Sequence, residues 1–403
     1  MSYQNASWAQ PVSQITRENH IVTLTVPAAA EIGDSLERVG TPSLLIDLDV
    51  FDANLQAMAD LVSVQGVRLR PHAKVHKTSA IARRQVAAGA VGICCQKLSE
   101  AYPFAAAGIE SIHISNEFVG EDKLRMATAL AAVTRLSVCV DSLSQIAALA
   151  AAAEHAGVFI TVFAEVDIGQ QRCGVRSAPA LLRLVDAILP MSHLHFGGIQ
   201  AYHGGIQHLR DWSERKRGAQ RAAEQAASFV AALRARGIDC PVVTGGGTGS
   251  VEFDIRSGVF NEVQPGSYLF LDGDYQENDW AGAPRPGNSL FLLSTIMSAP
   301  TAEQAVCDVG LKSLAVDSGL PRSLSYLPGA SGPALRYTAA NDEHGMLTVE
   351  SGGESDGEPL EGRRIMLVPG HCDPTVNLHD EFICYRGERV QAIWPIDARG
   401  LSR

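Results

Sequence analysis

The segment LRPHAKVHK, residues 69–77, places one arginine, two lysines and two histidines at the end of a strand-like run. Positive charges this close repel one another, and this repulsion, together with any desolvation, is expected to lower the pKa of at least one lysine. A neutral lysine amine is the nucleophile that forms a Schiff base. The segment therefore predicts a reactive lysine, with a solvated basic loop as the alternative.

Eight strand-like runs, the first of which ends at Lys74, are separated mostly by alanine-rich amphipathic stretches. Strands that are apolar throughout and alternate with helices favour a parallel sheet covered on both faces. Eight is the number of strands that closes a (β/α)8 barrel. We therefore predict an α/β fold with a (β/α)8 TIM-type barrel over residues 41–285. The predicted strands are residues 67–74, 91–97, 111–117, 135–142, 161–169, 196–204, 241–249 and 260–268.

The regions that flank the predicted barrel have different patterns. Residues 1–40 are polar and contain several prolines and alanines, and we expect an N-terminal arm without an assigned role. Residues 43–49 predict a ninth strand that has no place in the ring and pairs with the C-terminal region, and Asp49 is predicted to cap a helix over 50–62. Residues 286–403 show short alternating runs with glycine and aspartate turns, which predict an antiparallel β domain.

Composition excludes several classes of partner. The chain has 403 residues, enough for two or three domains, and a net charge of -11, which argues against nucleic acid or an anionic membrane as a partner. No apolar segment is long enough to span a bilayer, and the first twenty residues show no signal-peptide pattern. The eight cysteines lack a repeated CxxC spacing, which predicts reduced thiols and a cytoplasmic location.

Polar residues recur at the C-terminal ends of the eight predicted strands. In barrel enzymes this rim carries the catalytic groups, because the loops that follow the strands are free to vary. Lys74 is one of these rim residues, so we predict that it takes part in the chemistry. The complete set is Lys74, Gln96, Asn116, Asp141, Asp167, Tyr202, His203, Thr248 and Ser267.

Two glycine-rich turns follow the seventh and eighth strands, GGGTGS at residues 245–250 and PGSY at 265–268. Glycines let backbone N–H groups approach an anion closely, and Thr248 and Ser267 add hydroxyl donors. Phosphate sites in these barrels recur after strands seven and eight. The turns predict a phosphate site, and two ordinary tight turns are the alternative.

A reactive lysine and a phosphate site on one barrel rim indicate pyridoxal 5'-phosphate as the cofactor. Arg172 follows the fifth strand and is placed to face the pyridine nitrogen. Arginine cannot accept a proton from the ring, so the nitrogen would stay unprotonated and the cofactor would be a weaker electron sink. Pairing of Arg172 with Asp167 or Glu165 is the alternative.

The segment PGHCDPT, residues 369–375, contains a candidate metal site. In an extended segment residues two apart share a face, so His371 and Asp373 would point together. A pair without a third protein ligand leaves positions open for water and substrate, as in catalytic sites. Imidazole with a hard oxygen suits manganese, and cobalt, magnesium and zinc are alternatives. Surface polar residues without a metal are the simpler interpretation.

Nine motifs between residues 40 and 403 support a family assignment: RPHAKVHK, GICCQKLSEA, HISNE, VDIGQQRCGV, GIQAYHGGIQH, GGGTGSVEFD, GSYLFLDGDY, NDEHG and PGHCDPTVNLHD. In this order they resemble the D-threonine aldolase family, metal-activated members of the alanine-racemase-like (fold-type III) pyridoxal-phosphate enzymes. One departure is Asp308-Val309-Gly310, where the family has Asp-Ala-Gly. The N-terminal arm has no counterpart.

The resemblance implies roles for individual residues. Lys74 would form the Schiff base, and Arg172 would meet the pyridine nitrogen. His371 and Asp373 would bind the metal, and Asp342 would line the substrate site. His371, a metal-bound water or a histidine such as His203 would be the general base. The residues that would hold the cofactor and its phosphate are Tyr202, Gly247, Thr248, Gly249, Gly266, Ser267 and Tyr268.

The resemblance also implies an activity and an assembly. The expected reaction is retro-aldol cleavage of small D-β-hydroxy-α-amino acids, such as D-threonine or D-phenylserine, to glycine and an aldehyde, in a homodimer. Alternatives with the same motifs are a D-3-hydroxyaspartate aldolase and a dehydratase of D-serine or D-3-hydroxyaspartate. Dehydrating relatives usually carry cysteine two residues after the metal histidine, where this chain has Asp373. A non-catalytic pyridoxal-phosphate carrier is the alternative from another class.

Overall fold

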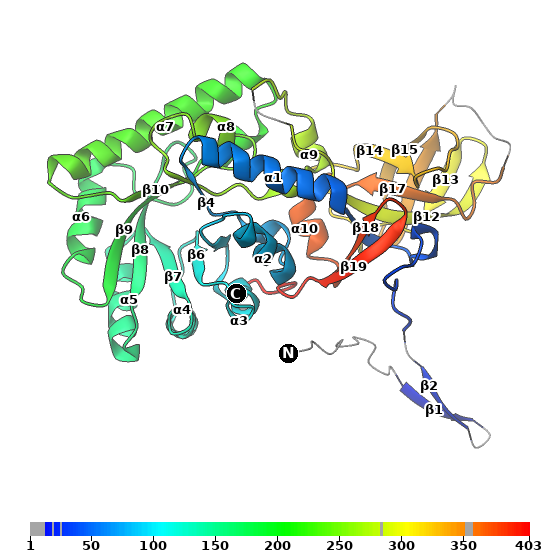
Figure 1. Ribbon diagram of the computed structural model, residues 1–403, viewed down its shortest axis with the longest axis horizontal. Helices are drawn as coiled ribbons and strands as arrows, with labels where there is room; N and C mark the ends of the chain where they lie inside the picture. The colour runs from blue at the N-terminus through cyan, green and yellow to red at the C-terminus, as the bar shows by residue number, and fades with distance from the viewer. Residues whose placement is uncertain (1–12, 18–19, 25, 283–284, 351–357) are drawn as a thin grey trace.

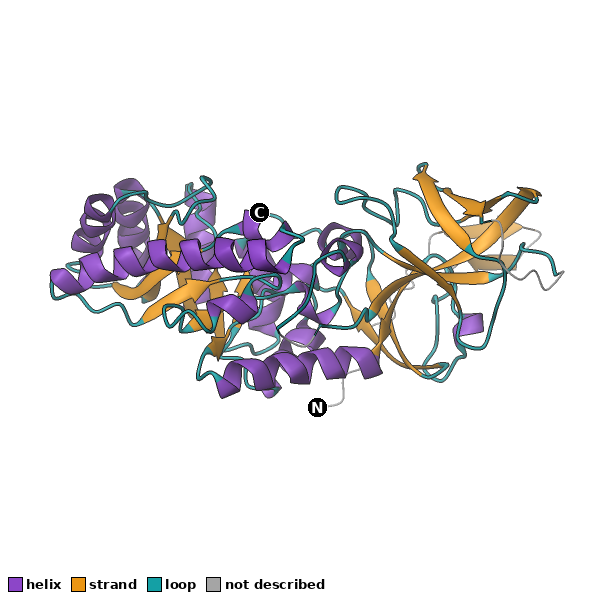
Figure 2. Ribbon diagram, turned by 90° about the horizontal axis from the view of Figure 1, so that it is seen from above, coloured by secondary structure: helices purple, strands orange, loops and turns teal. Residues whose placement is uncertain are grey.

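The computed structural model describes residues 13–17, 20–24, 26–282, 285–350 and 358–403. Within these residues the chain forms a helix-covered barrel and a second body built mostly of strands (Figures 1 and 2). The N-terminal arm contains a two-stranded antiparallel hairpin, β1 (Ser13–Arg17) and β2 (His20–Leu24). No helix in the described part of the chain has the length and apolar character that a membrane crossing requires.

The eight barrel strands are parallel, and each is hydrogen-bonded to its neighbours in the order β4-β11-β10-β9-β8-β7-β6-β5. The ring closes between its first and last strands, where Val91 N donates to Leu69 O and Cys94 N donates to Pro71 O. This confirms the predicted α/β barrel. The strands are β4 (Arg68–Leu69), β5 (Ile93–Cys95), β6 (Ser111–Ile114), β7 (Arg135–Val140), β8 (Ile160–Val166), β9 (Leu194–Ala201), β10 (Val242–Gly245) and β11 (Glu262–Val263).

Helices cover the outside of the strands, as Figure 2 shows for the helical half of the molecule. Their apolar residues recur at helical spacing, for example Phe51, Leu55, Met58 and Val62, all buried on one face of α1. Each such side chain contributes roughly 1.5–3 kcal/mol by leaving water. The helices are α1 (Leu48–Val64), α2 (Ser79–Ala87), α3 (Leu98–Ala106), α4 (Glu121–Ala131), α5 (Leu143–Ala156), α6 (Ala178–Ile188), α7 (Trp212–Ala235), α8 (Val251–Asp254) and α9 (Gly273–Gln276).

The start of α1 differs from the prediction. Asp47, not Asp49, caps the helix, because its Oδ1 accepts from the backbone N of Asp49 at 2.9 Å and of Val50 at 3.3 Å. Asp49 lies inside the first helical turn, where a carboxylate still interacts favourably with the helix dipole. The helix therefore begins two residues earlier than the sequence pattern indicates.

The second body is a mixed sheet rather than a purely antiparallel one. β3 (Ser43–Asp47) lies between β12, with which it is antiparallel, and β18, with which it is parallel. The strand that precedes the barrel therefore lies in the β domain. The other strands of this domain are β12 (Leu290–Thr301), β13 (Gln304–Cys307), β14 (Ser323–Tyr326), β15 (Leu335–Ala340), β16 (Gly345–Val349), β17 (Arg364–Val368), β18 (Glu381–Arg386) and β19 (Arg389–Pro395).

A short helix, α10 (Cys372–Val376), connects the β domain to the barrel rim. It packs against the 3-10 turn η2 (Ala73–Val75) that follows β4. The prediction of an extended segment here is wrong: His371 is the N-cap of α10, and Asp373 lies in its first turn. Asp272, at the end of the barrel, fixes this start by accepting from Cys372 N at 2.9 Å.

Candidate active site

A pocket of about 260 Å³ opens at the C-terminal ends of the barrel strands. Seven of the residues that the sequence predicts for the site line it, and they come from five different strand ends. The seven are Lys74, Arg172, Tyr202, Gly247, Thr248, Gly266 and Ser267.

Five other predicted site residues do not line this pocket: His371 and Asp373, which are described below, and Gly249, Tyr268 and Asp342. Gly249 N donates to Gln207 Oε1 at 2.8 Å behind the glycine turn. The side chain of Tyr268 is buried on the far side of its turn, with Gln85 Nε2 donating to its hydroxyl at 3.2 Å. Asp342 is exposed in the loop between β15 and β16.

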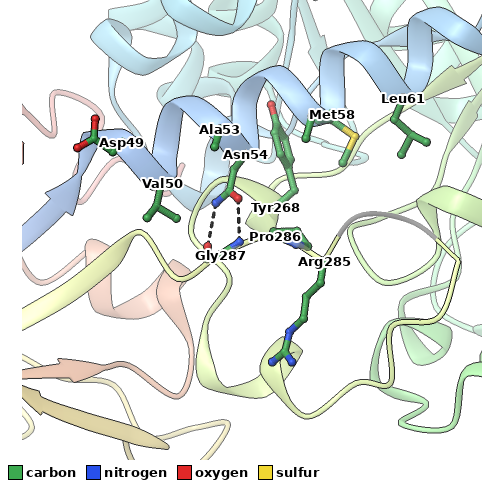
Figure 3. Close-up of a pocket in the computed structure, with 11 residues that line it drawn as sticks. Asp49, Val50, Ala53, Asn54, Met58, Leu61, Tyr268, Arg285, Pro286 and Gly287 are labelled. Carbon is green, nitrogen blue, oxygen red and sulfur yellow. Dashed lines mark hydrogen bonds between the residues drawn. The ribbon is translucent and has the colours of Figure 1, made fainter.

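Tyr268 instead lines a separate groove of about 460 Å³ on the outside of the barrel (Figure 3). Its walls are α1 and the chain around Gly287, which Asn54 holds by one hydrogen bond in each direction, both 2.8 Å long. The lining is mostly apolar and holds none of the rim residues. The chemistry-bearing side chains therefore gather in the smaller pocket.

Lys74 lies on η2, where it points at an acid from the distant end of the chain. Its Nζ donates to Asp373 Oδ1. Desolvation lowers the pKa of Lys74, but the adjacent Asp373 carboxylate outweighs it and raises that pKa well above its ordinary value. The expected lowering of a lysine pKa by neighbouring cations is therefore wrong for Lys74, whose pKa Asp373 raises.

The other cations of the segment do not act on Lys74 as the sequence suggested. Burial lowers the pKa of both His72 and His76 to about 3, so these rings are neutral. Lys77 is buried and pairs with Glu100 at 2.5 Å. Because both imidazole rings are neutral and Glu100 compensates the charge of Lys77, these groups exert little repulsion on the Lys74 ammonium. Asp373 is therefore the group that sets the charge state of Lys74.

His371 and Asp373 lie close together, with 3.7 Å between His371 Nε2 and Asp373 Oδ2, and Asp373 contacts Lys74 of the pocket lining. Burial raises the pKa of Asp373, but Lys74 and His371 outweigh it and lower that pKa to about 2, so the carboxylate is ionised. Asp317 Oδ2 lies 2.6 Å from His371 Nδ1. A carboxylate on Nδ1 leaves Nε2 free as a metal ligand. These residues fit a divalent cation.

Sequence analysis missed Asp317, because nothing in its local sequence connects it with a histidine 54 positions later. It also missed His72, whose Nε2 lies 3.0 Å from Ser115 Oγ and 3.2 Å from Gln96 Oε1 at the pocket floor. His72 lies two positions before Lys74 in the same segment, and that spacing was an available signal. Gln200, Gln264 and Tyr275 complete the lining.

The glycine turns form a cradle with an unused donor. Thr248 Oγ1 is buried and has no hydrogen-bond partner in the described structure. A Cβ at Gly247 would lie 2.6 Å from Gln207 Oε1, and one at Gly266 would lie 3.0 Å from His72 O, so a side chain at either position would have to displace its neighbour. A buried hydroxyl without a partner, beside backbone that side chains cannot cover, fits a phosphate group. The residues present therefore fit pyridoxal phosphate.

Arg172 lines the opposite wall, with its guanidinium carbon 5.5 Å from the centre of the Tyr202 ring. Of the two alternative partners, Asp167 is engaged elsewhere: it binds Arg176 at 3.1 Å and accepts from Gly169 N and Gln171 N. The charge of Arg172 does act on the other, Glu165, whose pKa it lowers against the effect of burial. His203, the histidine proposed as a possible base, is not among the residues that line the pocket.

Two family models match the chain. Residues 46–274 match the alanine racemase N-terminal domain, and residues 289–385 match the putative serine dehydratase domain. A D-threonine aldolase from Arthrobacter sp. is 48% identical over 94% of this chain and 98% of its own length. The chain belongs to the D-threonine aldolase family. The motifs had predicted this family, and the prediction is confirmed.

Further relatives of the D-threonine aldolase family agree in fold. The crystal structure of a D-threonine aldolase from Filomicrobium marinum superposes with a TM-score of 0.88, at 47% identity, and covers 93% of this chain and 100% of its own. A 3-hydroxy-D-aspartate aldolase from Paracoccus denitrificans is 38% identical over 93% of this chain and 95% of its own length.

Proposed function

We propose that the protein is a carbon–carbon lyase that uses pyridoxal 5'-phosphate and a divalent cation to cleave D-β-hydroxy-α-amino acids to glycine and an aldehyde. The observation that supports the proposal is that Lys74, which lines the pocket, contacts Asp373, and that Asp373 in turn lies 3.7 Å from His371, about three hundred positions later in the chain. When bound, the cofactor accepts the electron pair of the breaking Cα–Cβ bond and the cation lowers the pKa of the substrate hydroxyl.

The role of each pocket residue would follow from its position. Lys74 would hold the cofactor covalently, and Thr248, Ser267 and the backbone at Gly247 would bind its phosphate. Arg172 would face the pyridine nitrogen across the Tyr202 ring. This arginine cannot give the nitrogen a readily transferable proton, so cleavage would depend strongly on polarisation of the hydroxyl at the metal site.

His371 and Asp373 would hold the cation, and Asp317 would keep the proton of His371 on Nδ1. A carboxylate oxygen with an imidazole nitrogen supports manganese as the metal. A relative that dehydrates would be expected to have a thiolate at position 373. Asp373 therefore supports cleavage over loss of water.

A product assay tests the activity directly. The protein, supplied with pyridoxal phosphate and Mn²⁺, is given D-threonine, D-phenylserine or D-3-hydroxyaspartate, with L-threonine as the control. We expect glycine and aldehyde from the D-substrates, none from L-threonine, and loss of activity with a chelator. Ammonia and a keto acid without glycine would contradict the proposal. A marked preference for D-3-hydroxyaspartate would favour the second candidate, supported by the 38% identical relative.

We also propose a homodimer in a reducing compartment. Asp342 is exposed and belongs to the β domain, so a second copy could bring it to the substrate pocket. All eight cysteines are unpaired, which supports a cytoplasmic location. Light scattering measures the assembly, and Asp342→Asn should lower kcat/KM in a dimer without changing cofactor binding. A monomer with full activity would contradict this assembly.

A further inference from the structure

Three residues from neighbouring strand ends converge beside Arg172, outside the pocket described above. Glu117 follows β6, Asp141 follows β7, and Cys173 lies in the loop after β8. One ligand atom from each lies within 4.8 Å of the others. β6, β7 and β8 are consecutive parallel neighbours, so their carboxyl ends meet at the same edge of the barrel.

A third acid lies beside this cluster. Glu165, on β8, is 5% exposed, and its Oε2 has no hydrogen-bond partner within the described ranges. Its carboxyl group faces that of Glu117, whose Oε1 is also buried, and one proton lies between the two carboxyl groups. Burial, and next the charge of Glu117, raises the pKa of Glu165 to about 9. Three carboxyl groups here face one arginine, Arg172, so the cluster has room for further positive charge.

We propose that Glu117, Asp141 and Cys173 bind a divalent cation, with Glu165 as the fourth ligand, at a site separate from His371 and Asp373. A thiolate sulfur with carboxylate oxygens suits zinc better than manganese or magnesium. Zinc–sulfur distances of about 2.3 Å and zinc–oxygen distances of about 2.0–2.2 Å put neighbouring ligand atoms about 3.5 Å apart. Side-chain rotations would have to bring the ligand atoms of Glu117, Asp141 and Cys173, which lie within 4.8 Å of one another, to that spacing.

Binding of a cation at this site releases protons from the side chains that bind it. Burial, and next the charge of Glu117, raises the pKa of Cys173 to about 11, so its thiol is protonated without a cation. The cation replaces the thiol proton, and also the proton of Glu165, and both protons leave to solvent. Zinc affinity at this site should therefore increase with pH.

The site would act on the pocket by holding a loop. Cys173 is adjacent to Arg172, and the loop around them has positive φ at Gly169, Gln171 and Gly174. Glycines adopt such angles freely, but Gln171 does not, so its position in the loop depends on outside contacts. A cation on Cys173 would tie the loop to β6 and β7 and fix Arg172 against Tyr202.

Metal counting on the full-length protein tests the proposal without relying on activity. The protein is stripped with a chelator, dialysed against Zn²⁺, and analysed for metal per chain. We expect two zinc ions in the wild type, one in Cys173→Ser and in Glu117→Gln, and one in His371→Asn. Cys240→Ser is the matched control, a half-buried cysteine elsewhere on the barrel, and should keep both ions.

Cobalt provides a second readout that identifies the thiolate. With Co²⁺, a sulfur-to-metal absorption band should appear in the wild type and in His371→Asn and be absent in Cys173→Ser. Circular dichroism checks that each variant is folded. A His371→Asn protein that binds no zinc, or a Cys173→Ser protein that binds as much as the wild type, would overturn the proposal. The cluster would then hold a proton between Glu117 and Glu165.

Discussion

Lys74 and Asp373 are 299 positions apart, and their contact joins the two halves of the candidate site. An ammonium group beside a carboxylate stays protonated, so the contact with Asp373 keeps Lys74 a cation. The reactive form of Lys74 is the neutral amine, which requires the Asp373 carboxylate to interact with another positive charge instead. One carboxylate, that of Asp373, therefore both sets the charge of Lys74 and belongs to the predicted metal motif.

Replacing Lys74 by alanine should abolish retention of the cofactor. After incubation with pyridoxal phosphate and removal of the excess, the wild type should keep a visible Schiff-base absorption band and Lys74→Ala should show none. The reason is that Lys74 is the one lysine among the described residues that line the pocket. Lys97→Ala, at an exposed strand end nearby, is the control and should keep the band. A band of full intensity in Lys74→Ala would remove this lysine from the site.

Asp317 should act on metal affinity through His371. Asp317→Asn keeps the size of the side chain but removes the charge that holds the proton on His371 Nδ1. We expect Mn²⁺ to bind about 10–100-fold more weakly, as for other carboxylates behind a metal histidine. Titration calorimetry measures the affinity. Asp380→Asn, which removes a surface partner of Arg399, should bind Mn²⁺ like the wild type. Equal affinities in all three proteins would show that Asp317 has no such role.

At the level of elements, the number and order of the barrel strands follow from the sequence, because buried parallel strands leave continuous apolar runs. Their ends do not. The first run was predicted over residues 67–74, but β4 covers only Arg68–Leu69, because the chain leaves the sheet to place Lys74 on η2. The ninth strand lies in the β domain through pairing with β12 and β18.

The parts of the site that consist of residues close together in the sequence were predictable. The parts that depend on contacts between distant residues were not. The motif around His371 is visible in the sequence, but its helical form depends on Asp272, which holds Cys372 N from 100 positions away. Pro374 is compatible with that helix, because the first turn needs no backbone N–H from it. The charge of Lys74 was misjudged for the same reason, since Asp373 lies outside any sequence window around it.

The register of β9 depends on Gly198. Its φ is +133°, and a Cβ there would lie 1.9 Å from Val242 O on the neighbouring strand. Gly198→Ala must therefore displace backbone, and we expect a loss of at least about 3 kcal/mol in the free energy of unfolding. Gly237→Ala is the matched control: its φ is +69°, no atom lies within 4 Å, and the expected loss is about 1–2 kcal/mol from backbone strain alone. Equal losses, measured by denaturant unfolding, would mean that the strand contact is unimportant.

Over the whole molecule, the C-terminal segment fastens the β domain to the barrel beside the active-site loop. Ala398 N donates to Lys77 O at 2.9 Å, and Lys77 Nζ donates to Leu401 O at 3.3 Å. Ser99 N donates to Arg403 O at 2.9 Å. Lys77 has a φ of +50°, so these contacts support a strained position three residues from Lys74.

Deletion of residues 398–403 should therefore loosen the site before it unfolds the barrel. We expect a lower thermal midpoint and faster loss of bound pyridoxal phosphate on dilution, with the circular dichroism spectrum preserved. Arg403→Ala keeps the backbone contacts of the segment and should behave like the wild type. Cofactor release at the wild-type rate from the shortened chain would show that the segment does not support the Lys74 loop.

Two buried histidines of the barrel make the stability of the whole molecule depend on pH. Burial lowers the pKa of His76 to about 3 and that of His113 to about 4. Both are neutral in the folded protein near pH 5, whereas an unfolded histidine takes up a proton below about 6.5. The unfolded state then binds more protons, so stability falls as the pH falls from 6.5 toward 4, by about 2 kcal/mol per histidine at pH 5.

Comparison with a variant isolates this effect from the carboxyl groups, which titrate in the same range. His113→Gln should be less stable at pH 7.5, because it loses the packing of the ring against Phe163. The gap in thermal midpoint between wild type and variant should narrow as the pH is lowered to 5, since the variant no longer has a proton to gain at this position on unfolding. His195→Gln, at an exposed position, should follow the wild type at every pH. A gap for His113→Gln that stays constant with pH would mean that His113 is already charged in the folded barrel.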